Sequence, residues 1–174
     1  MLTLDIKGAF DAVLAGRLKQ RLQDQGWPSK LVSWVASFTN NRTASLQLGD
    51  FTSQAFQVPA GLPQGSPISP ILFMLFIEPL FKIGSLQARR GRFGYADDVC
   101  QIVASPSLET NIQTLEAIAK EMQQWGSQEG LLFDLGKSEI QHFSRSCKDS
   151  NPALQIKSGD SLLDIHPPGN NQAV

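Results

Sequence analysis

Two short acidic motifs that stand far apart in the chain constrain its fold more than any other feature. The first reads LDIKGAFD at residues 4–11 and the second reads GYADD at residues 94–98. Asp5 ends a short apolar segment, and Asp97 and Asp98 lie where a hairpin turn is expected, so one fold can bring the three carboxylates together. Several anionic oxygens at one place are what a pair of Mg²⁺ ions requires. The motifs therefore predict the two halves of one metal site, of the kind that moves phosphoryl groups.

Further patterned segments lie between and after these motifs. Residues 61–73 read GLPQGSPISPILF, a loop punctuated by Gly and Pro that opens into an apolar run, and residues 131–138 and 140–143 read LLFDLGKS and IQHF. In this order, LDIKGAFD, GLPQGSPISPILF and GYADD resemble motifs A, B and C of a reverse transcriptase palm, most similar to those of non-LTR retrotransposons. The later pair resembles motif D. The resemblance covers about residues 1–145, and three long motifs in the correct order are far more specific than any one alone.

The resemblance implies an α+β polymerase palm in which an antiparallel sheet packs on helices. It implies an RNA-directed DNA polymerase that uses two Mg²⁺ (or Mn²⁺) ions, roughly 3.5 to 4 Å apart, to transfer a nucleotide from a dNTP to a primer. The other partners implied are an RNA template and a DNA primer. We expect residues 1–145 to form the palm, with motifs A to D, and residues 146–174 to form a C-terminal segment leading towards a primer grip and thumb.

The chain begins at motif A, so we expect complete fingers and thumb, which the same polyprotein would supply, to be lacking. The isolated chain is then expected not to extend a primer at a measurable rate. Without those parts nothing basic encloses the triphosphate, and the reacting groups are not held in line.

The resemblance assigns roles to the aspartates that the residues alone leave open. An isolated Asp5 after a strand can equally cap the helix that follows. Asp97 and Asp98 favour metal binding, because adjacent like charges at a tight turn repel unless a cation holds them. By the resemblance, Asp5 and Asp97 are the main ligands of both ions, Asp98 lies nearby, and the three form the catalytic set. Asp11 is left outside this set, since it is as easily the N-cap of a helix over residues 12–25.

Five further positions are expected to bind the substrate. The resemblance makes Phe10 the side chain that crowds the incoming sugar and excludes a ribose hydroxyl, although a core aromatic is the simpler explanation. It makes Gln64 and Gly65 contacts of the nucleotide and template, where a turn at a helix start explains the backbone but not the glutamine. Tyr95 either touches the primer end or packs under the hairpin. Lys137 either neutralises the leaving pyrophosphate or is a solvated surface lysine.

The composition bounds the class of protein. The 174 residues, 41% of them hydrophobic, suffice for one domain with a core. A formal net charge of -1 and a pI near 6.1 lack the basic balance of a protein that grips phosphates tightly. Positive charge is nonetheless clustered, and a solvated surface explains the clusters as well as phosphate contact does. The clustered residues are Arg17, Lys19 and Arg21, and then Arg89, Arg90 and Arg92.

The cysteines and the apolar runs indicate the environment in which the protein is expected to fold. Cys100 and Cys147 lie far apart without metal-binding spacing, which fits a reducing, intracellular environment, in the nucleus or the cytoplasm. No apolar run approaches the roughly 20 residues needed to cross a bilayer, so no membrane role is expected.

Hydrophobic spacing and turn residues predict the order of the elements. We expect a strand at residues 1–6, helices at 12–25 and 28–39, a hairpin over 43–58, a mostly buried helix over 70–81, a hairpin over 91–104, a long helix whose apolar stripe runs from Ile112 to Trp125, strands near 131–135 and 138–143, and a weak hairpin over 153–165.

Other interpretations remain open. The chain is alternatively a decayed retroelement remnant that folds but does not polymerise, or part of a larger protein in which the carboxylates have only structural or binding roles. Viral RNA-dependent RNA polymerases favour Gly-Asp-Asp and a polar sugar gate, whereas this chain has Ala96 and Phe10. Group II intron proteins share YADD, but GSPISP at residues 65–70 is more similar to the retrotransposon form of motif B.

Overall fold

The computed structural model of the chain describes residues 1–84, 90–144, 151–159 and 161–167. Arg89 and Cys147 lie outside these described residues. The backbone divides into two compact units, which we describe one at a time. We call Met1–Lys7 together with Glu78–Val174 the sheet unit, and Gly8–Ile77 the helical unit. The first acidic motif is therefore split, because its strand belongs to one unit and its remainder to the other.

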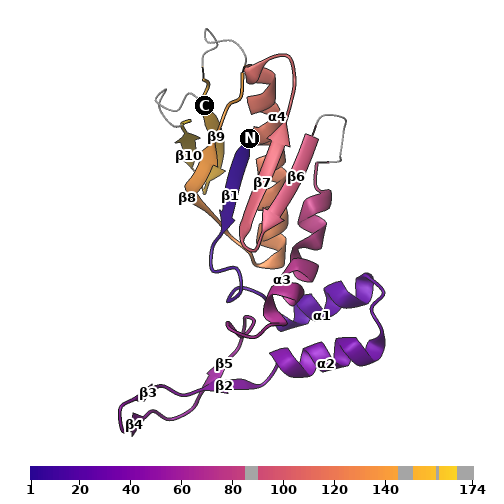
Figure 1. Cartoon of the computed structure of the whole chain (residues 1–174), viewed down its shortest axis with the longest axis vertical. Coiled ribbons are helices and arrows are strands. Elements are labelled where there is room, and N and C mark those ends of the chain that lie inside the picture. The colour runs from indigo at the N-terminus through magenta and orange to yellow at the C-terminus, as the bar shows by residue number, and fades with distance from the viewer. Residues whose placement is uncertain (85–89, 145–150, 160, 168–174) are drawn as a thin grey trace. The chain divides into compact units, whose positions relative to one another are not determined.

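The sheet unit is built on a four-stranded antiparallel sheet with the order β6-β7-β1-β8 (Figure 1). The strands are β1 (Leu2–Ile6), β6 (Arg90–Tyr95), β7 (Asp98–Val103) and β8 (Phe133–Ile140). Although β1 is first in the chain, it lies in the interior of the sheet. Its buried residues alternate with partly exposed ones, so that one face lies in the core and the other does not.

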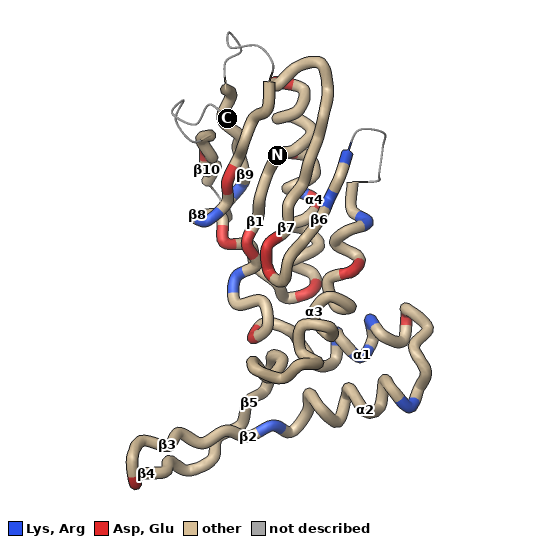
Figure 2. Tube along the Cα trace, in the orientation of Figure 1, with Lys and Arg blue, Asp and Glu red and all other residues tan. Residues whose placement is uncertain are grey.

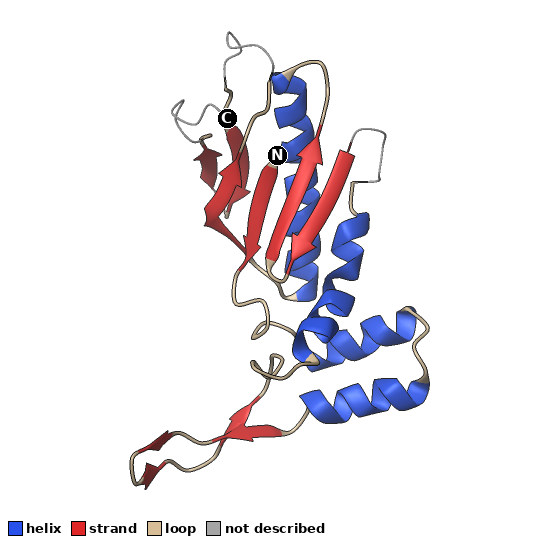
Figure 3. Ribbon diagram, viewed as in Figure 1, coloured by secondary structure: helices blue, strands red, loops and turns tan. Residues whose placement is uncertain are grey.

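A long helix, α4 (Leu108–Glu129), runs along one face of this sheet (Figure 3). The Oγ atom of Ser107 accepts the N–H of Thr110 at 3.3 Å at its start, and Gly130 ends it in a left-handed conformation with φ of 82°. Its buried stripe consists of Ile112, Leu115, Ile118, Ala119 and Met122. The predicted long amphipathic helix is confirmed, and this stripe supplies much of the core.

The chain after α4 differs in one respect from the expectation. The two strands predicted near residues 131–135 and 138–143 are a single strand, β8, whose register against β1 breaks in the middle. The predicted C-terminal hairpin is confirmed as β9 (Leu154–Ser158) paired with β10 (Ser161–Ile165). β9 packs against α4. The expected domain boundary at residue 145 stays a prediction.

The helical unit contains α1 (Ala15–Asp24), α2 (Ser29–Thr39) and α3 (Ser69–Ile77), and α1 packs against both other helices. The predicted helix over residues 70–81 is α-helical only to Ile77, and a 3₁₀ turn (Glu78–Lys82) follows. Pro79 explains the change, because it has no N–H to continue the helix. Because Pro79 cannot donate a hydrogen bond to the carbonyl of Leu75, that carbonyl accepts one from the side-chain amide of Gln25 at 2.9 Å.

Between α2 and α3 the helical unit forms the predicted hairpin. Its inner pair is β2 (Arg42–Ala44) with β5 (Phe56–Val58), and its outer pair is β3 (Gln47–Leu48) with β4 (Phe51–Thr52). The turn falls at Gly49-Asp50, as the sequence predicts. Within the described residues, no helix is both long enough and apolar enough to span a membrane.

Candidate active site

Three aspartates lie side by side on neighbouring strands of the sheet unit. Asp5 on β1 pairs with Asp98 on β7 and with Asp134 on β8. Residues directly opposite each other on antiparallel strands point to the same face, and here that face is the one away from the buried residues of β1. Figure 2 shows acidic positions gathered at these strand ends. Like charges placed opposite one another destabilise a sheet, so the row favours a role in holding a cation.

Asp97 occupies the two-residue turn between β6 and β7, next to the Tyr95–Asp98 pair that closes the hairpin. Its backbone carbonyl accepts the N–H of Ile6 at 3.1 Å, which ties the turn to the end of β1. Ala96, the other turn residue, has φ of 53°, a left-handed conformation that costs a residue with a Cβ about 1 to 2 kcal/mol. The predicted hairpin with carboxylates at its turn is confirmed. Strained backbone of this kind is frequent at functional sites.

Lys137 reaches this row from an irregular stretch of β8. Asp134 pairs with Asp5, and Glu139 pairs with Thr3, so residues 135–138 all stand opposite the single residue between Thr3 and Asp5. This bulge places the Nζ atom of Lys137 3.3 Å from the Oδ2 atom of Asp5. Bulges often re-aim a side chain next to an active site. The bulge therefore explains how a residue so distant in sequence meets the first acidic motif.

The two members of this ion pair differ in exposure. The side chain of Asp5 is 15% exposed, whereas that of Lys137 is 66% exposed. The hydrogen bond to Asp5 and the charge of Asp5 raise the pKa of Lys137, and the charges of Asp134 and Asp97 raise it further. Asp5, Asp134 and Asp97 thus all act on one ammonium group. Lys137 is therefore a largely solvated surface lysine that also pairs with Asp5, and its role at the leaving pyrophosphate stays a prediction.

A divalent metal fits the chemistry of these donors. Carboxylate oxygens are the preferred ligands of Mg²⁺, which usually takes one or two of them and completes its shell with water and substrate phosphates. In the described ranges, no group of three or more His, Cys, Asp or Glu residues is arranged to hold an ion by itself. The expected metal site of Asp5, Asp97 and Asp98 therefore stays a prediction.

The helical unit joins two other predicted residues through a contact that the sequence analysis missed. The Nε2 atom of Gln64 lies 3.1 Å from both carboxylate oxygens of Asp11. The N-cap interpretation of Asp11 is wrong, because α1 begins only at Ala15 and Leu14 occupies the N-cap position. Asp11 instead holds the glutamine that begins the turn before α3. Asp11 and Gln64 are far apart in the sequence, and no local pattern indicates that their side chains form a hydrogen bond.

Gly61 explains why these two segments lie so close. Its N–H donates to the carbonyl of Val13 at 2.8 Å, and the N–H of Leu62 donates to the carbonyl of Phe10 at 2.7 Å. Gly61 has φ of +88°, and a Cβ there would lie 2.9 Å from the Cα of Asp11. Backbone therefore packs directly on backbone, which only glycine permits.

The two remaining substrate positions of this unit have different surroundings. The ring of Phe10, which is half-buried, packs on that of Phe73 with centroids 5.1 Å apart. The core-aromatic explanation of Phe10 thus has a structural basis, and its role as a sugar gate stays a prediction. Gly65 also has φ of +88°, but a Cβ there would meet nothing within 4 Å. This glycine is required by conformation and not by a close approach.

Tyr95 does not pack under the hairpin, and Arg90 and Arg92 are not simply solvated. Tyr95 is 85% exposed, so the interpretation that it packs under the hairpin is wrong. Arg92 is half-buried and donates to the side chain of Gln101 and the carbonyl of Leu80. Burial lowers the pKa of Arg92. Arg90 donates to the carbonyl of Gly84 at 3.3 Å, so these two arginines bind backbone and neighbouring side chains of their own unit.

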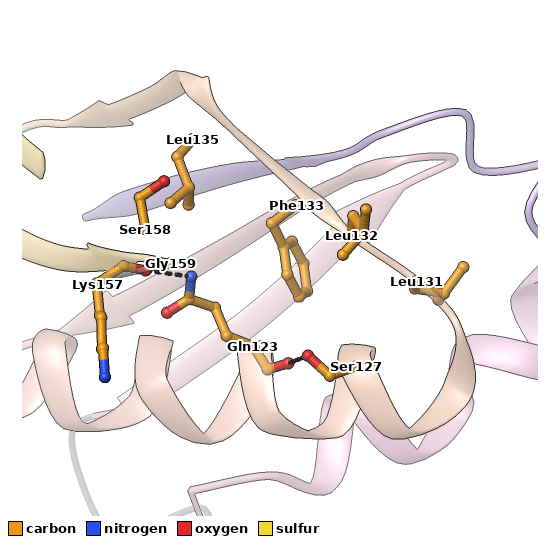
Figure 4. A pocket seen from close by; sticks show the side chains of 9 residues that line it. All are labelled: Gln123, Ser127, Leu131, Leu132, Phe133, Leu135, Lys157, Ser158 and Gly159. Carbon is orange, nitrogen blue, oxygen red and sulfur yellow. Dashed lines mark hydrogen bonds between the residues drawn. The ribbon is translucent and has the colours of Figure 1, made fainter. Parts of the chain in front are cut away.

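A cavity of about 230 Å³ lies elsewhere in the sheet unit (Figure 4). It is lined by residues of α4, of β8 and the segment before it, and of the end of β9 with Gly159. Gln123 there donates to the carbonyl of Lys157 at 2.9 Å. None of the residues predicted to bind metal or substrate lines it.

Several curated proteins are similar to this chain. The RNA-directed DNA polymerase from mobile element jockey of Drosophila melanogaster is 28% identical over 128 residues, which are 70% of this chain and 14% of that protein. The jockey protein of Drosophila funebris is 25% identical over 94% of this chain and 18% of its own length. The Pol polyprotein from the type-2 retrotransposable element R2DM is 32% identical over 79 residues, 45% of this chain and 8% of that protein. The chain therefore spans less than a fifth of these relatives.

Solved structures and a family profile extend the comparison. The apo telomerase of Candida tropicalis, truncated from its C-terminal domain, matches 95% of this chain and 34% of its own chain, with a TM-score of 0.65 and 12% identity, which indicates a shared fold. The profile described as reverse transcriptase (RNA-dependent DNA polymerase) matches residues 1–159. This match includes all the motifs quoted above. The chain accordingly belongs to the reverse transcriptase family and is of the non-LTR retrotransposon type.

Proposed function

We propose that this chain is the palm of an RNA-directed DNA polymerase, which transfers a nucleotide from a dNTP to the 3′-hydroxyl of a primer paired with an RNA template. The observation that carries the proposal is the row of aspartates on β7, β1 and β8, with Asp97 tied to the same strand ends. Such a row has no structural benefit of its own, because like charges repel. The row suits a reaction in which the phosphates of the substrate arrive with bound metal ions and supply the remaining metal ligands.

In this proposal Asp5 and Asp97 hold two divalent ions, and Asp98 supports them. When bound, the ions supply positive charge for the attacking and leaving oxygens of an in-line displacement. Lys137 neutralises charge on the departing pyrophosphate, for which its exposed ammonium is suited. The exposed ring of Tyr95 contacts the primer end. The protein contributes position and charge and forms no covalent intermediate.

The helical unit supplies residues that select the nucleotide. Phe10 crowds the 2′-carbon of the incoming sugar and so excludes a ribonucleotide. Gln64 and Gly65 contact the nucleotide and template, and the bond from Gln64 to Asp11 holds the amide ready in a defined orientation.

Titration of the chain with Mn²⁺ tests the metal site. We expect Asp5→Asn and Asp97→Asn each to weaken Mn²⁺ binding about tenfold or more, since each removes an anionic ligand. Asp11→Asn is the matched control, because Asp11 belongs to the same motif but is an exposed residue with an amide partner. Unchanged affinity in both site variants would show that the carboxylates have another role.

Polymerase activity is tested by joining the chain to flanking segments from the jockey protein of Drosophila melanogaster. We expect this chimera to extend a DNA primer on poly(rA) with dTTP and Mg²⁺, and Asp97→Asn to reduce the rate at least about a hundredfold. Asp50→Asn, at the exposed tip of the hairpin in the helical unit, should extend normally. A folded chimera that binds metal but does not extend primers would instead favour an inactive remnant.

A further inference from the structure

The ion pair between Lys137 and Asp5 occupies the carboxylate that the proposed function assigns to a metal ion. The Nζ atom of Lys137 lies 3.3 Å from the Oδ2 atom of Asp5. If an ammonium group and a divalent cation bind that oxygen together, each interaction is weaker than it would be alone. The question is therefore how the lysine and the metal coexist at one strand end.

The unequal exposure of the pair suggests which partner moves. Asp5 is held within the sheet, paired on both sides, and its side chain is 15% exposed. Lys137 is 66% exposed and lies at the end of a flexible four-carbon side chain. Withdrawal of the ammonium needs only side-chain rotation, whereas withdrawal of the carboxylate would need the strand to move. The lysine is the partner that can leave.

The β8 bulge holds Lys137 where it meets Asp5. The Oδ1 atom of Asp134 accepts the N–H of Gly136 at 3.2 Å, and the backbone carbonyl of Asp134 accepts the hydroxyl of Ser138 at 3.3 Å. These two bonds bracket Lys137 within the bulge. Its position beside Asp5 is therefore maintained by local structure and does not depend on the ion pair alone.

We propose that Lys137 is a built-in counter-cation of Asp5, which a divalent ion must displace in order to bind there. Without metal, the ammonium offsets the repulsion between Asp5 and the neighbouring carboxylate of Asp134. With metal, the lysine is released, still close to the site, and becomes available to a phosphate. The inference rests on the proposed function, since it assumes that Asp5 is a metal ligand. It adds that Lys137 opposes metal binding before it assists the substrate.

Linkage gives the expected size of the effect. If the lysine weakens metal binding by some factor, then the metal weakens the lysine–aspartate pair by the same factor. Exposed ion pairs are weak, so removal of the ammonium should lower the Kd for Mn²⁺ about two- to fivefold. The opposite sign is expected if Lys137 only supports the fold of the site, because its loss would then disorder the ligands.

The experiment is an Mn²⁺ titration of the whole chain by calorimetry, with variants that separate charge from shape. Lys137→Met should bind Mn²⁺ about two- to fivefold more tightly than the unmodified chain, and Lys137→Arg, which keeps the charge, should bind about as the unmodified chain does. Lys120→Met, on the exposed side of α4, removes the same charge far from the aspartates in sequence and controls for net charge. In an Asp5→Asn background, Lys137→Met should have no effect on affinity.

The outcomes distinguish this inference from the proposed function. If Asp5→Asn weakens binding but Lys137→Met leaves it unchanged or weaker, the counter-cation is disproved and the metal site stands. An equal gain in Lys137→Met and Lys120→Met disproves it as well, since the effect is then one of net charge. If no variant binds Mn²⁺, both the metal site and the counter-cation are disproved.

Discussion

The two aspartates of the first acidic motif, Asp5 and Asp11, belong to different units and have different partners. Asp5 lies in a strand, is mostly buried, and faces an ammonium group and two further carboxylates. Asp11 lies in an exposed turn and accepts a neutral amide from Gln64. The sheet unit therefore places several like charges together at strand ends, whereas the helical unit joins single charged groups to neutral partners, as in the bonds from Gln64 to Asp11 and from Arg42 to the carbonyl of Gly61. Motif residues that look alike in sequence thus have different physical roles.

The largest expected effect tests the backbone fit of the helical unit. Gly61→Ala should lower the free energy of unfolding by about 3 kcal/mol, because the new Cβ is strained at positive φ and also collides with backbone. Gly65→Ala has the same φ but open space around it, and should cost only about 1 kcal/mol. Urea unfolding measures both. Equal losses would mean that conformation alone, and not the close approach to Asp11, requires Gly61.

The second expected effect concerns the selection of the substrate by the helical unit. In the jockey chimera, Phe10→Val should raise ribonucleotide incorporation relative to deoxyribonucleotide about tenfold, since a smaller side chain leaves room for the 2′-hydroxyl. Phe10→Tyr keeps the ring and should retain the discrimination. Competition between rUTP and dTTP on poly(rA) measures the ratio. If Phe10→Val leaves it unchanged, Phe10 serves only to pack on Phe73.

The smallest effect concerns backbone strain in the charged sheet unit. Ala96→Gly should raise the free energy of unfolding by about 0.5 kcal/mol, because relief of the left-handed strain slightly exceeds the entropic cost of glycine. Ala55→Gly, at an exposed loop position of the helical unit, should instead lower it by about 0.4 to 1 kcal/mol, because glycine raises the entropy of the unfolded chain. Thermal or urea unfolding gives both values. A loss of stability in Ala96→Gly as large as that in Ala55→Gly would show that the turn is unstrained.

Local patterns sufficed for most elements of the fold. The stripe that begins at Ile112 predicted α4, and alternation around Gly49-Asp50 and around Asp97-Asp98 predicted two hairpins that the structure contains. Errors occurred where a distant residue decides the outcome. The helix expected from residue 12 begins at Ala15 because the preceding turn is bonded to the loop at Gly61. Arg92 is half-buried because Gln101 and the carbonyl of Leu80 accept its hydrogen bonds.

The sequence by itself determined the family, the α+β class and the candidate aspartates of motifs A and C, because these depend on short motifs in a fixed order and on local periodicity. Only the tertiary structure decided that Asp134 joins the row beside Asp5, that Lys137 meets Asp5, and that Asp11 accepts Gln64. Each of these contacts joins segments that are distant in the chain. Strand register, a bulge and a backbone packed on a glycine set such contacts, and none of the three has a local signature that periodicity can detect.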